Sequence, residues 1–164
     1  MTQTLQEIQE RPVNYVPKEL LASPGFLLAK MGVAMKTRAL DEFEQAGYEA
    51  YHYGVLALLG ESACDTQAAI ADALAVDRSQ LVGILDSLEE RKLIERHRDR
   101  SDRRRHVVTL TPDGRKQLVR LRGIVRRVED EFLAPLDAKS RETFHDLLLQ
   151  LACFHDPRCG AGAA

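Results

Sequence analysis

The sequence has no hydrophobic run long enough to cross a membrane. A spanning helix needs about eighteen or more apolar residues in succession, and no such stretch occurs among the 164 residues. The first residues, MTQTLQEIQERP, are polar and lean acidic, whereas a signal peptide starts with basic residues followed by apolar ones. We therefore expect a cytoplasmic protein with no membrane partner. Because 45% of the residues are hydrophobic, the chain is able to form one domain with its own core.

The sequence also lacks the motifs of common enzyme classes. It contains no glycine-rich phosphate loop, no G-x-S-x-G turn and no H-E-x-x-H motif. The carboxylates mostly occupy helix caps or helix surfaces, and His97 and His106 have no serine or cysteine nucleophile close to them in the sequence. We predict that the protein is not an enzyme and uses no cofactor.

Cysteine is scarce, and its spacing suggests no pairing. In a reducing cytoplasm the three cysteines, Cys64, Cys153 and Cys159, are more often plain side chains than disulfides. A thiol near a helix start, such as Cys64, can become reactive, so redox regulation through Cys64 or the C-terminal cysteines is an alternative hypothesis. The spacing of Cys153, His155 and Cys159 is not a recurring zinc pattern, and we predict core packing and no metal site there.

A capped helix begins at Asp77. Leu81, Ile84, Leu85 and Leu88 recur at three- and four-residue steps and form one apolar stripe that must face a core. Asp77 is a good N-cap, and Gln80 completes the spacing of a capping box. The first turns are otherwise small or polar, which suits docking into a DNA groove. The residues on this face are Arg78, Ser79, Gln80, Val82 and Gly83.

An arginine-rich hairpin follows this helix. The segments 93–98 and 106–110 favour β-strands, and turn-forming residues separate them. Six arginines and two aspartates lie between Arg96 and Arg105, in a chain whose net charge is −2. An isolated charge run is usually a solvated loop, but arginine also enters a narrow minor groove at modest desolvation cost. The candidate DNA contacts here are Arg98, Arg100, Arg103 and Arg104, with Asp102 able to brace a neighbouring arginine.

A second short helix is predicted upstream, over Thr66 to Leu74, with Asp65 as its cap. Only Ala75, Val76 and Asp77 separate the two helices, and no glycine lies in this turn. Two helices joined by about three residues form a helix-turn-helix, in which the first crosses the DNA backbone and the second enters the major groove. Together with the hairpin, this arrangement predicts a winged helix-turn-helix.

Residues from about 24 to 151 resemble the MarR (multiple antibiotic resistance regulator) family of transcription regulators. The resemblance is carried by three motifs: LAVDRS from Leu74, LEERKLIER from Leu88, and DRR from Asp102 followed by LTPDG from Leu110. It implies a mainly α fold with a small two- or three-stranded β wing. It also implies that Arg78, Ser79, Gln80 and Val82 lie on the recognition helix, that Arg103 and Arg104 lie on the wing, and that Asp102 orients the wing arginines.

Two residues depart from the family pattern. Lys92 stands where the family usually has glycine, so either Lys92 adopts a left-handed conformation or the helix ends differently. Gly83 replaces a longer polar residue that is common there, and we expect it to remove a backbone or base contact. The operator preference is therefore not transferable from a relative.

Long amphipathic helices are predicted at both ends of the chain. One starts at Ser23 and Pro24 and stops near Gly47, and another spans about 49–59. Two more follow Thr111 and Asp137, with apolar residues at a 3.5-residue period in the first. Packing against the first helix within one chain is the simpler use of these stripes, but their extent also predicts a homodimer.

These predictions together define a domain organisation. We expect an extended or partly ordered N-terminal arm (1–22), dimerisation helices (23–60 and 112–156), a winged helix-turn-helix DNA-binding lobe (61–111) and a flexible tail (157–164). A two-fold dimer on double-stranded DNA predicts an inverted repeat with half-sites about 10 to 11 base pairs apart. A winged helix that binds protein instead of DNA is the alternative, and the arginine cluster argues against it.

The family resemblance further implies a repressor that is released by a small-molecule effector, often aromatic or phenolic. Tyr48, Tyr51 and His52 lie near the family's ligand site and are candidates for stacking on such a molecule or hydrogen-bonding to it. Tyrosines at helix starts are more often half-buried packing residues, so the sequence leaves both interpretations open.

Overall fold

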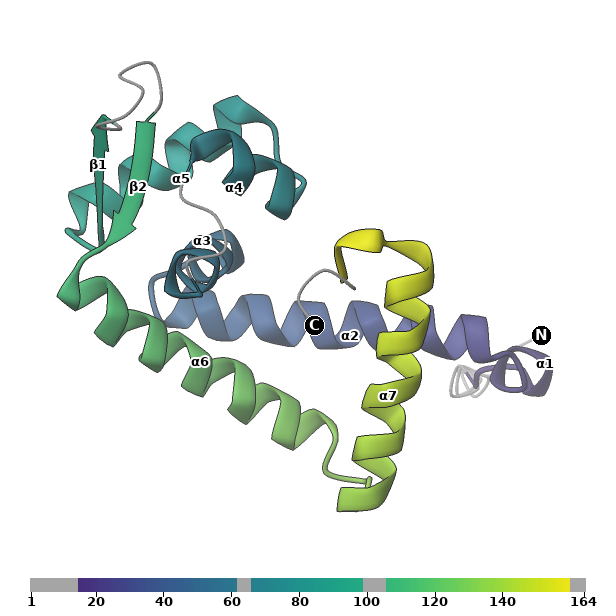
Figure 1. Cartoon of the computed structure of the whole chain (residues 1–164). Helices are drawn as coiled ribbons and strands as arrows, with labels where there is room; N and C mark the ends of the chain where they lie inside the picture. The colour runs from purple at the N-terminus through teal and green to yellow at the C-terminus, as the bar shows by residue number, and fades with distance from the viewer. Residues whose placement is uncertain (1–14, 62–65, 99–105, 160–164) are drawn as a thin grey trace, which may run out of the picture.

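The computed structural model describes residues 15–61, 66–98 and 106–159. It is mainly helical with one two-stranded antiparallel sheet, as predicted (Figure 1). The elements in chain order are α1 (Lys18–Leu21), α2 (Pro24–Gln45), α3 (Ala50–Gly60), α4 (Gln67–Leu74), α5 (Arg78–Glu90), β1 (Ile94–Arg98), β2 (His106–Leu110), α6 (Pro112–Phe132), α7 (Ala138–His155) and the 3₁₀ turn η1 (Pro157–Cys159).

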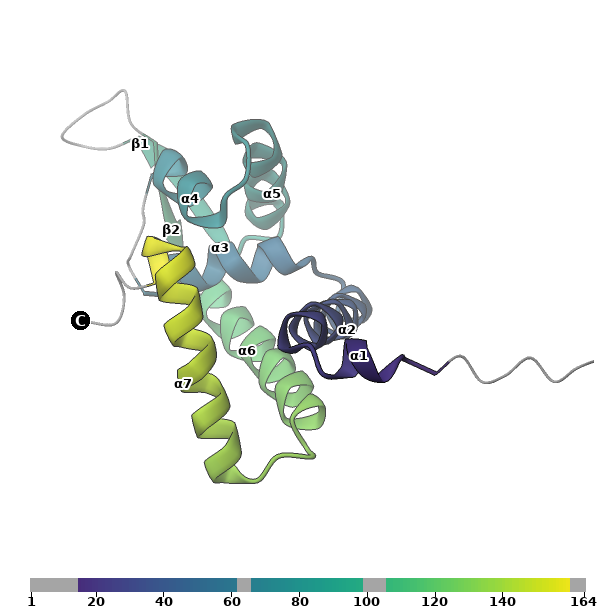
Figure 2. The same ribbon diagram turned by 90° about the vertical axis from the view of Figure 1, so that its right-hand side faces the viewer.

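The helices α4 and α5 and the hairpin β1–β2 form a lobe at one end of the molecule (Figures 1 and 2). Helix α3 lies beneath this lobe and contacts α4, α5 and β2. The long helix α6 leaves the hairpin and packs against α2 and α3, and the turn that joins α6 to α7 lies at the end opposite the lobe. No helix in the described part of the chain is long and apolar enough to cross a membrane.

Side-chain caps define where most of the helices begin. Ser23, Asp77, Thr111 and Asp137 each accept a hydrogen bond from a backbone N–H in the first turn of the helix that follows, as the sequence predicts. The predicted cap of α4 is wrong: Thr66 rather than Asp65 caps this helix, with its Oγ1 accepting from the N–H of Ala69 at 3.3 Å. Thr66 still has extended backbone angles, so it is the last residue before the helix. Asp65 itself lies outside the described residues.

The core lies between the lobe, α3 and the first half of α6. The predicted stripe of α5 is buried, with each of its four residues at most 6% exposed. The largest fully buried side chains around it are Val55, Leu56, Ile70, Ile94, Val108 and Leu121. Burial of each such side chain stabilises the fold by about 1.5 to 3 kcal/mol relative to leaving it in water, so this cluster sets the position of α5 in the lobe.

Outside this core the long helices bury little in the single chain. Helix α2 buries only Phe43, and α7 buries none of its residues. Large hydrophobic side chains are exposed on both helices, among them Leu28, Met31, Phe144, Leu147 and Leu151.

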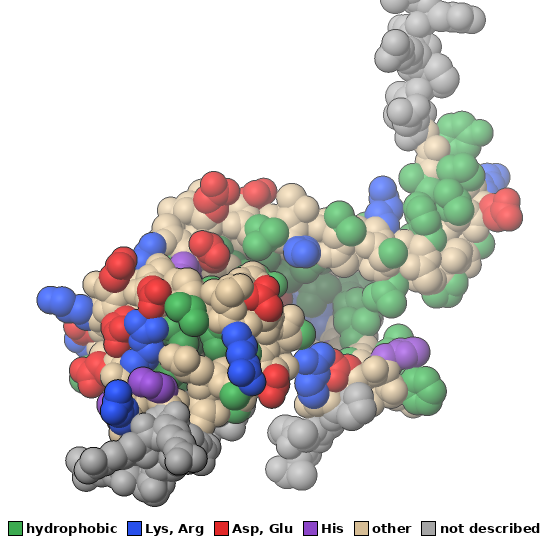
Figure 3. All heavy atoms as spheres, turned by 90° about the horizontal axis from the view of Figure 1, so that it is seen from above, with side chains coloured by type: hydrophobic (Ala, Val, Ile, Leu, Met, Phe, Trp, Pro, Cys, Tyr) green, Lys and Arg blue, Asp and Glu red, His purple; other side chains and the backbone are tan. Residues whose placement is uncertain are grey.

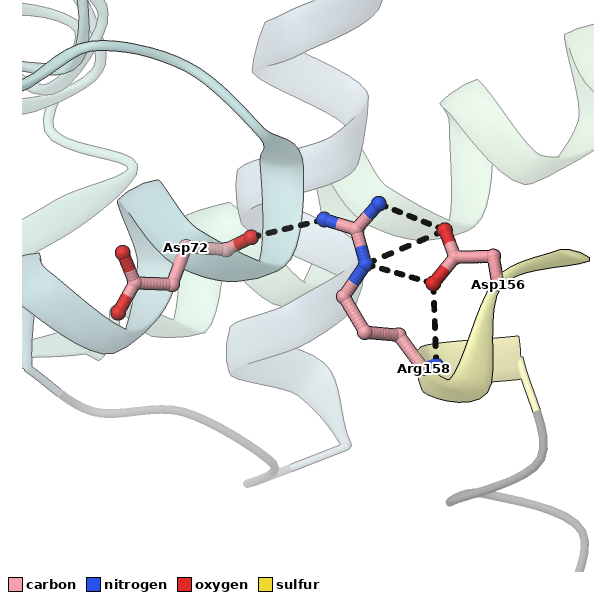
Figure 4. Close-up of polar contacts among 3 residues, drawn as sticks. All are labelled: Asp72, Asp156 and Arg158. Atoms are coloured by element: carbon pink, nitrogen blue, oxygen red, sulfur yellow. Dashed lines mark hydrogen bonds and ion pairs between the residues drawn. The ribbon is translucent and has the colours of Figure 1, made fainter.

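The end of α7 is tied to the lobe by Arg158 (Figure 4). Its Nη1 donates to the backbone oxygen of Asp72 in α4 at 3.1 Å. Its Nε and Nη2 donate to the carboxylate of Asp156 at 2.8 and 2.6 Å, and this pairing lowers the pKa of Asp156 to about 2. A cation near the last carbonyls of a helix is favoured by the helix dipole. Residues 157–159 of the predicted tail therefore form a turn that contacts α4.

Candidate nucleic-acid interface

The turn between α4 and α5 is tight although it contains no glycine. Ala75 adopts a left-handed conformation with φ of 52°, which costs about 1 to 2 kcal/mol for a residue with a Cβ. The N–H of Val76 then donates to the carbonyl of Ala71 at 3.1 Å, and Asp77 starts the next helix. The predicted three-residue link is confirmed, and it places α4 and α5 in contact as the two helices of a helix-turn-helix.

Helix α5 presents a polar face to solvent at its N-terminal end. Arg78, Ser79 and Gln80 are exposed, and Val82 is 44% exposed. A Cβ added at Gly83 would meet no atom within 4 Å, so packing does not require glycine there. The four predicted contact residues of this helix are thus all accessible from solvent.

Ser79 is held against the cap of this helix. Its Oγ donates to Asp77 Oδ1 at 2.6 Å, and the backbone N–H of Gln80 donates to the same oxygen at 2.8 Å. These two hydrogen bonds lower the pKa of Asp77, with Ser79 the larger cause. With its proton donated to Asp77, the Ser79 hydroxyl offers mainly lone pairs to a ligand, while Arg78 and Gln80 keep their donors.

The hairpin pairs Ile94 with Leu110 at its base and Arg98 with His106 at its far end. An additional bridge joins Val107 to Thr66, so the wing is linked to the start of α4 as well. Arg98 is exposed at the end of β1. Four of the predicted wing contacts, Arg100, Asp102, Arg103 and Arg104, lie outside the described residues.

The side chain of Arg96 links the wing to α5. It extends from β1 to α5, where its Nη2 pairs with Asp86 at 2.6 Å and its Nε donates to Glu89 at 2.9 Å. Its backbone N–H also donates to Glu89 at 3.1 Å. The hydrogen bonds with Arg96 lower the pKa of Glu89, and those with Glu89 raise the pKa of Arg96 further. Sequence reasoning counted Arg96 in the basic cluster and did not find these partners.

The chain leaves α5 through Lys92, for which the sequence left two alternatives. Lys92 adopts the left-handed conformation, with φ of 59°, so the first alternative is confirmed. This conformation turns the chain so that the N–H of Leu93 donates to the carbonyl of Leu88 at 2.9 Å and β1 can start. Thr111 then donates through Oγ1 to the carbonyl of Lys92 at 2.8 Å, which ties α6 to the same corner.

The three candidate ligand residues line a hollow of about 860 Å³ between α2, α3 and α5. Tyr51 is 39% exposed, whereas Tyr48 is half-buried and His52 is buried. The Nδ1 of His52 accepts from the backbone N–H of Glu49 at 2.9 Å, and burial is the main cause that lowers the pKa of this imidazole. His52 is therefore neutral with its proton on Nε2.

Arg91 also belongs to this hollow, although sequence reasoning did not single it out. Its guanidinium lies 4.7 Å from the centre of the Tyr48 ring, and its Nη1 donates to the carbonyl of Gly47 at 2.7 Å. More than forty positions separate Arg91 from Tyr48, so no local pattern links them.

The cysteines and histidines bring no metal site together in the described ranges, where no group of three or more potential ligands is found. Cys153 is half-buried and Cys159 is exposed. Cys64, the other residue of the redox alternative, lies outside the described residues.

Comparison with known proteins identifies relatives along most of the chain. Residues 49–105 match the model of the MarR family. The chain is 37% identical over 149 residues to a protein of Thauera aromatica named as a transcriptional regulatory protein for the hcr operon, covering 86% of this chain and 89% of that protein. It is 26% identical over 144 residues to the HTH-type transcriptional repressor NicR of Pseudomonas putida, covering 85% and 89% of the two chains.

Solved structures give the same result for the fold. The crystal structure of CouR from Rhodococcus jostii RHA1, bound to p-coumaroyl-CoA, superimposes with a TM-score of 0.66 and 29% sequence identity. The match covers 81% of this chain and 94% of CouR. The similarity therefore extends over the long helices as well as the lobe.

Proposed function

The chain belongs to the MarR family of transcription regulators, which are not enzymes, and from this membership we propose that it is a repressor that binds an inverted-repeat DNA operator as a homodimer. The main support for the proposal is the exposed polar N-terminal end of α5. The buried apolar stripe of the same helix fixes its position, and the arginine-rich hairpin follows it in the chain. The similarity to the repressor NicR supports the direction of regulation.

Each part of the chain has a role in this proposal. The lobe (61–111) binds DNA, with α5 in the major groove and the wing in the adjacent minor groove. Arg78 and Gln80 donate to bases or phosphates, Val82 makes an apolar contact, and Ser79 accepts. On the wing, Arg98, Arg100, Arg103 and Arg104 enter the minor groove or bind phosphates, and Asp102 orients them. Residues 23–60 and 112–156 form the dimer, flanked by the arm (1–22) and the tail (157–164).

The assignment of roles predicts different effects for two alanine substitutions. Arg104→Ala removes a phosphate contact, so binding should weaken for all duplexes and the slope of log affinity against log salt should flatten by about one unit. Gln80→Ala removes a base contact and should mainly relax the preference for the selected sequence. Fluorescence anisotropy with a duplex selected from a random pool, and with a scrambled duplex, measures both effects across a salt series.

Two results of this experiment would contradict the proposal at different levels. If the two substitutions exchange their effects, the roles of helix and wing are assigned the wrong way round. If the unmodified chain binds both duplexes weakly and without salt dependence, the fold is a protein-interaction module and the DNA assignment is wrong.

The hollow that Tyr48, Tyr51 and His52 line is the proposed effector site. CouR, a structural relative, was crystallised with p-coumaroyl-CoA, an aromatic acyl thioester, which supports an aromatic effector for this chain. The neutral His52 offers an Nε2–H to a phenol or carboxylate oxygen, and Tyr51 offers an accessible ring. Because the hollow joins α2 to α5, an occupant that fits one relative orientation of these helices shifts the population toward it and changes the spacing of the recognition helices.

Effector binding should be visible as stabilisation of the unmodified protein. In a thermal-shift screen of aromatic acids and phenols, an effector at a hundredfold excess over its Kd should add about 2.7 kcal/mol to the free energy of unfolding. Tyr51→Ala should abolish this shift, whereas substitution of the 79% exposed Tyr15 of the N-terminal arm, Tyr15→Ala, should not. A shift that survives Tyr51→Ala would place the ligand elsewhere, and a panel with no hit would remove the support for effector control.

A further inference from the structure

A cleft of about 580 Å³ opens on the proposed DNA-binding side of the lobe, between α4, α5 and β2. Four polar side chains line it: Thr66, which caps α4, Gln67 at the start of α4, Arg78 at the start of α5 and His106 at the start of β2. Figure 3 views the molecule from this side and shows histidine and cationic side chains next to each other on the surface of the lobe. Neither Gln67 nor His106 was predicted as a functional residue.

The register of the hairpin explains why His106 faces this cleft. Alternate residues of a strand share a face, so His106 lies on the same side of β2 as Val108 and Leu110, which are buried against the lobe. Its partner across the sheet is Arg98. His106 belongs to the last described residue pair of the hairpin and lies on the face of the wing that packs toward α5. It is exposed because the buried core does not extend as far as this pair.

The charged groups around His106 leave an excess of donors. Arg78 lies across the cleft on α5, and Arg98 lies opposite on β1. On its other side His106 borders a second hollow with Glu89 and Arg96. Glu89 is the acidic group that faces His106 there, and it already accepts hydrogen bonds from Arg96, which also pairs with Asp86. Arg78, Arg96 and Arg98 carry three positive charges against the two carboxylates Asp86 and Glu89, so these groups leave one net positive charge beside His106, together with the amide donors of Gln67.

We propose that this cleft holds one phosphate of the DNA backbone between the recognition helix and the wing, and that His106 binds this phosphate as an imidazolium. The proposal rests on the proposed DNA-binding function and adds two residues to it. A phosphodiester carries one negative charge and several acceptor oxygens, which match the donors of Arg78, His106 and the Gln67 amide. Arg78 then contacts the DNA backbone, and Gln80 and Val82 contact the bases.

Proton uptake follows from this contact. Histidine changes charge between about pH 5 and pH 8, and a bound phosphate favours the charged form. Binding of DNA is therefore coupled to uptake of a proton, so affinity rises as pH falls and declines as pH rises. This coupling between DNA binding and proton uptake involves only the DNA backbone, so it is the same for an operator and for any other duplex.

The test uses the full-length chain and a 5′-fluorescein-labelled 30-base-pair duplex of fixed arbitrary sequence, in a buffer of low ionic strength between pH 6 and pH 8. The unmodified protein should gain about threefold to tenfold more affinity over this range than His106→Gln. The matched control is His97→Gln, because His97 lies one rung away on the opposite face of the same hairpin and is paired with Val107. This control should keep the pH dependence, and His106→Lys should bind tightly at both ends of the range.

The possible outcomes distinguish failure of the phosphate contact at His106 from failure of the proposed DNA-binding function. An unaltered pH dependence in His106→Gln, or an equal loss in His97→Gln, would overturn the phosphate contact while leaving DNA binding intact. Failure of the unmodified chain to bind either this duplex or the duplex selected from a random pool, at any pH, would overturn the proposed function, and the phosphate contact with it. Circular dichroism of each variant at both pH limits identifies any loss that comes from unfolding, and His106→Lys then still tests the contact.

Discussion

Gly114→Ala should destabilise the protein more than any other single methyl group added to α6. A Cβ at this position would lie 2.0 Å from the carbonyl oxygen of Leu93 and 3.0 Å from Cδ2 of Leu110. The closer of these atoms belongs to the backbone that leaves α5 and enters β1, so it cannot move aside as a side chain would. The corner is also fixed by Thr111, whose Oγ1 accepts from the N–H of Gly114 at 2.9 Å.

The expected cost is about 3 kcal/mol or more in the free energy of unfolding, because overpacking against backbone forces the helix and the strand apart. For a chain of this length, each kilocalorie shifts the melting temperature by about 2 to 4 °C, so Tm should fall by about 6 to 12 °C. Thermal and urea unfolding followed by circular dichroism measure both quantities. Because the displaced corner carries the wing, affinity for DNA should fall as well, even below the melting temperature.

The matched control is Gly123→Ala on the same helix. A Cβ there would meet no atom within 4 Å, and alanine is favoured over glycine inside a helix by about 1 kcal/mol. This substitution should raise Tm slightly. Equal melting temperatures for the two variants would show that the close approach at Gly114 is not required for the fold.

Gly114 illustrates what the sequence could and could not predict. Its place in the LTPDG motif marks the junction of wing and helix, but only the structure shows that the motif needs glycine because the Leu93 carbonyl occupies the space of a Cβ. Local signals were sufficient where the cause is local: the stripe of α5, the caps at Asp77 and Thr111, and the proline that starts α6 are all found in the structure. The cap of α4 was assigned one residue too early because aspartate and threonine are both good caps, and only the structure shows that Thr66 accepts the hydrogen bond of the first turn.

Side-chain contacts between different helices and strands had no signal in the sequence pattern. Arg96 looked like one of six equivalent arginines, yet its charge is paired with Asp86 and Glu89. The positive charge available to DNA is therefore smaller than the count of arginines in the hairpin. Arg91 and Arg158 similarly find carbonyl partners in α2–α3 and α4 that depend on the packing of the whole chain. In each case a long arginine side chain connects two elements of the fold. The relative position of these elements determines the position of the recognition helix.

The second large effect is expected at the C-terminal helix, where Leu151→Glu should separate the proposed dimer into monomers. Leu151 is 49% exposed in the single chain and lies on the same face of α7 as Phe144 and Leu147, which are also exposed. A groove of about 330 Å³ between α2, α6 and α7 is lined by further apolar residues, among them Met31 and Leu148. A monomer would leave this whole surface in water, which is why we propose that a second copy covers it.

A carboxylate at this position costs the single chain little, because the side chain is half in solvent, but it would be unpaired within the dimer interface. Size-exclusion chromatography with light scattering should show a change from dimer to monomer at micromolar concentration. The two lobes would then bind their half-sites separately, so operator affinity should fall by about two to four orders of magnitude while binding to a single half-site is retained.

Gln150→Glu is the control, because it introduces the same charge one residue earlier, on the polar face of α7. It should leave both the dimer and the operator affinity unchanged. If Leu151→Glu also remained dimeric with full affinity, α7 would not form the interface, and the exposed apolar residues of α2 would have to supply it instead. Monomers that keep full operator affinity would have a different meaning: the spacing of two recognition helices would not determine binding, and an effector acting on that spacing would have no means of releasing the DNA.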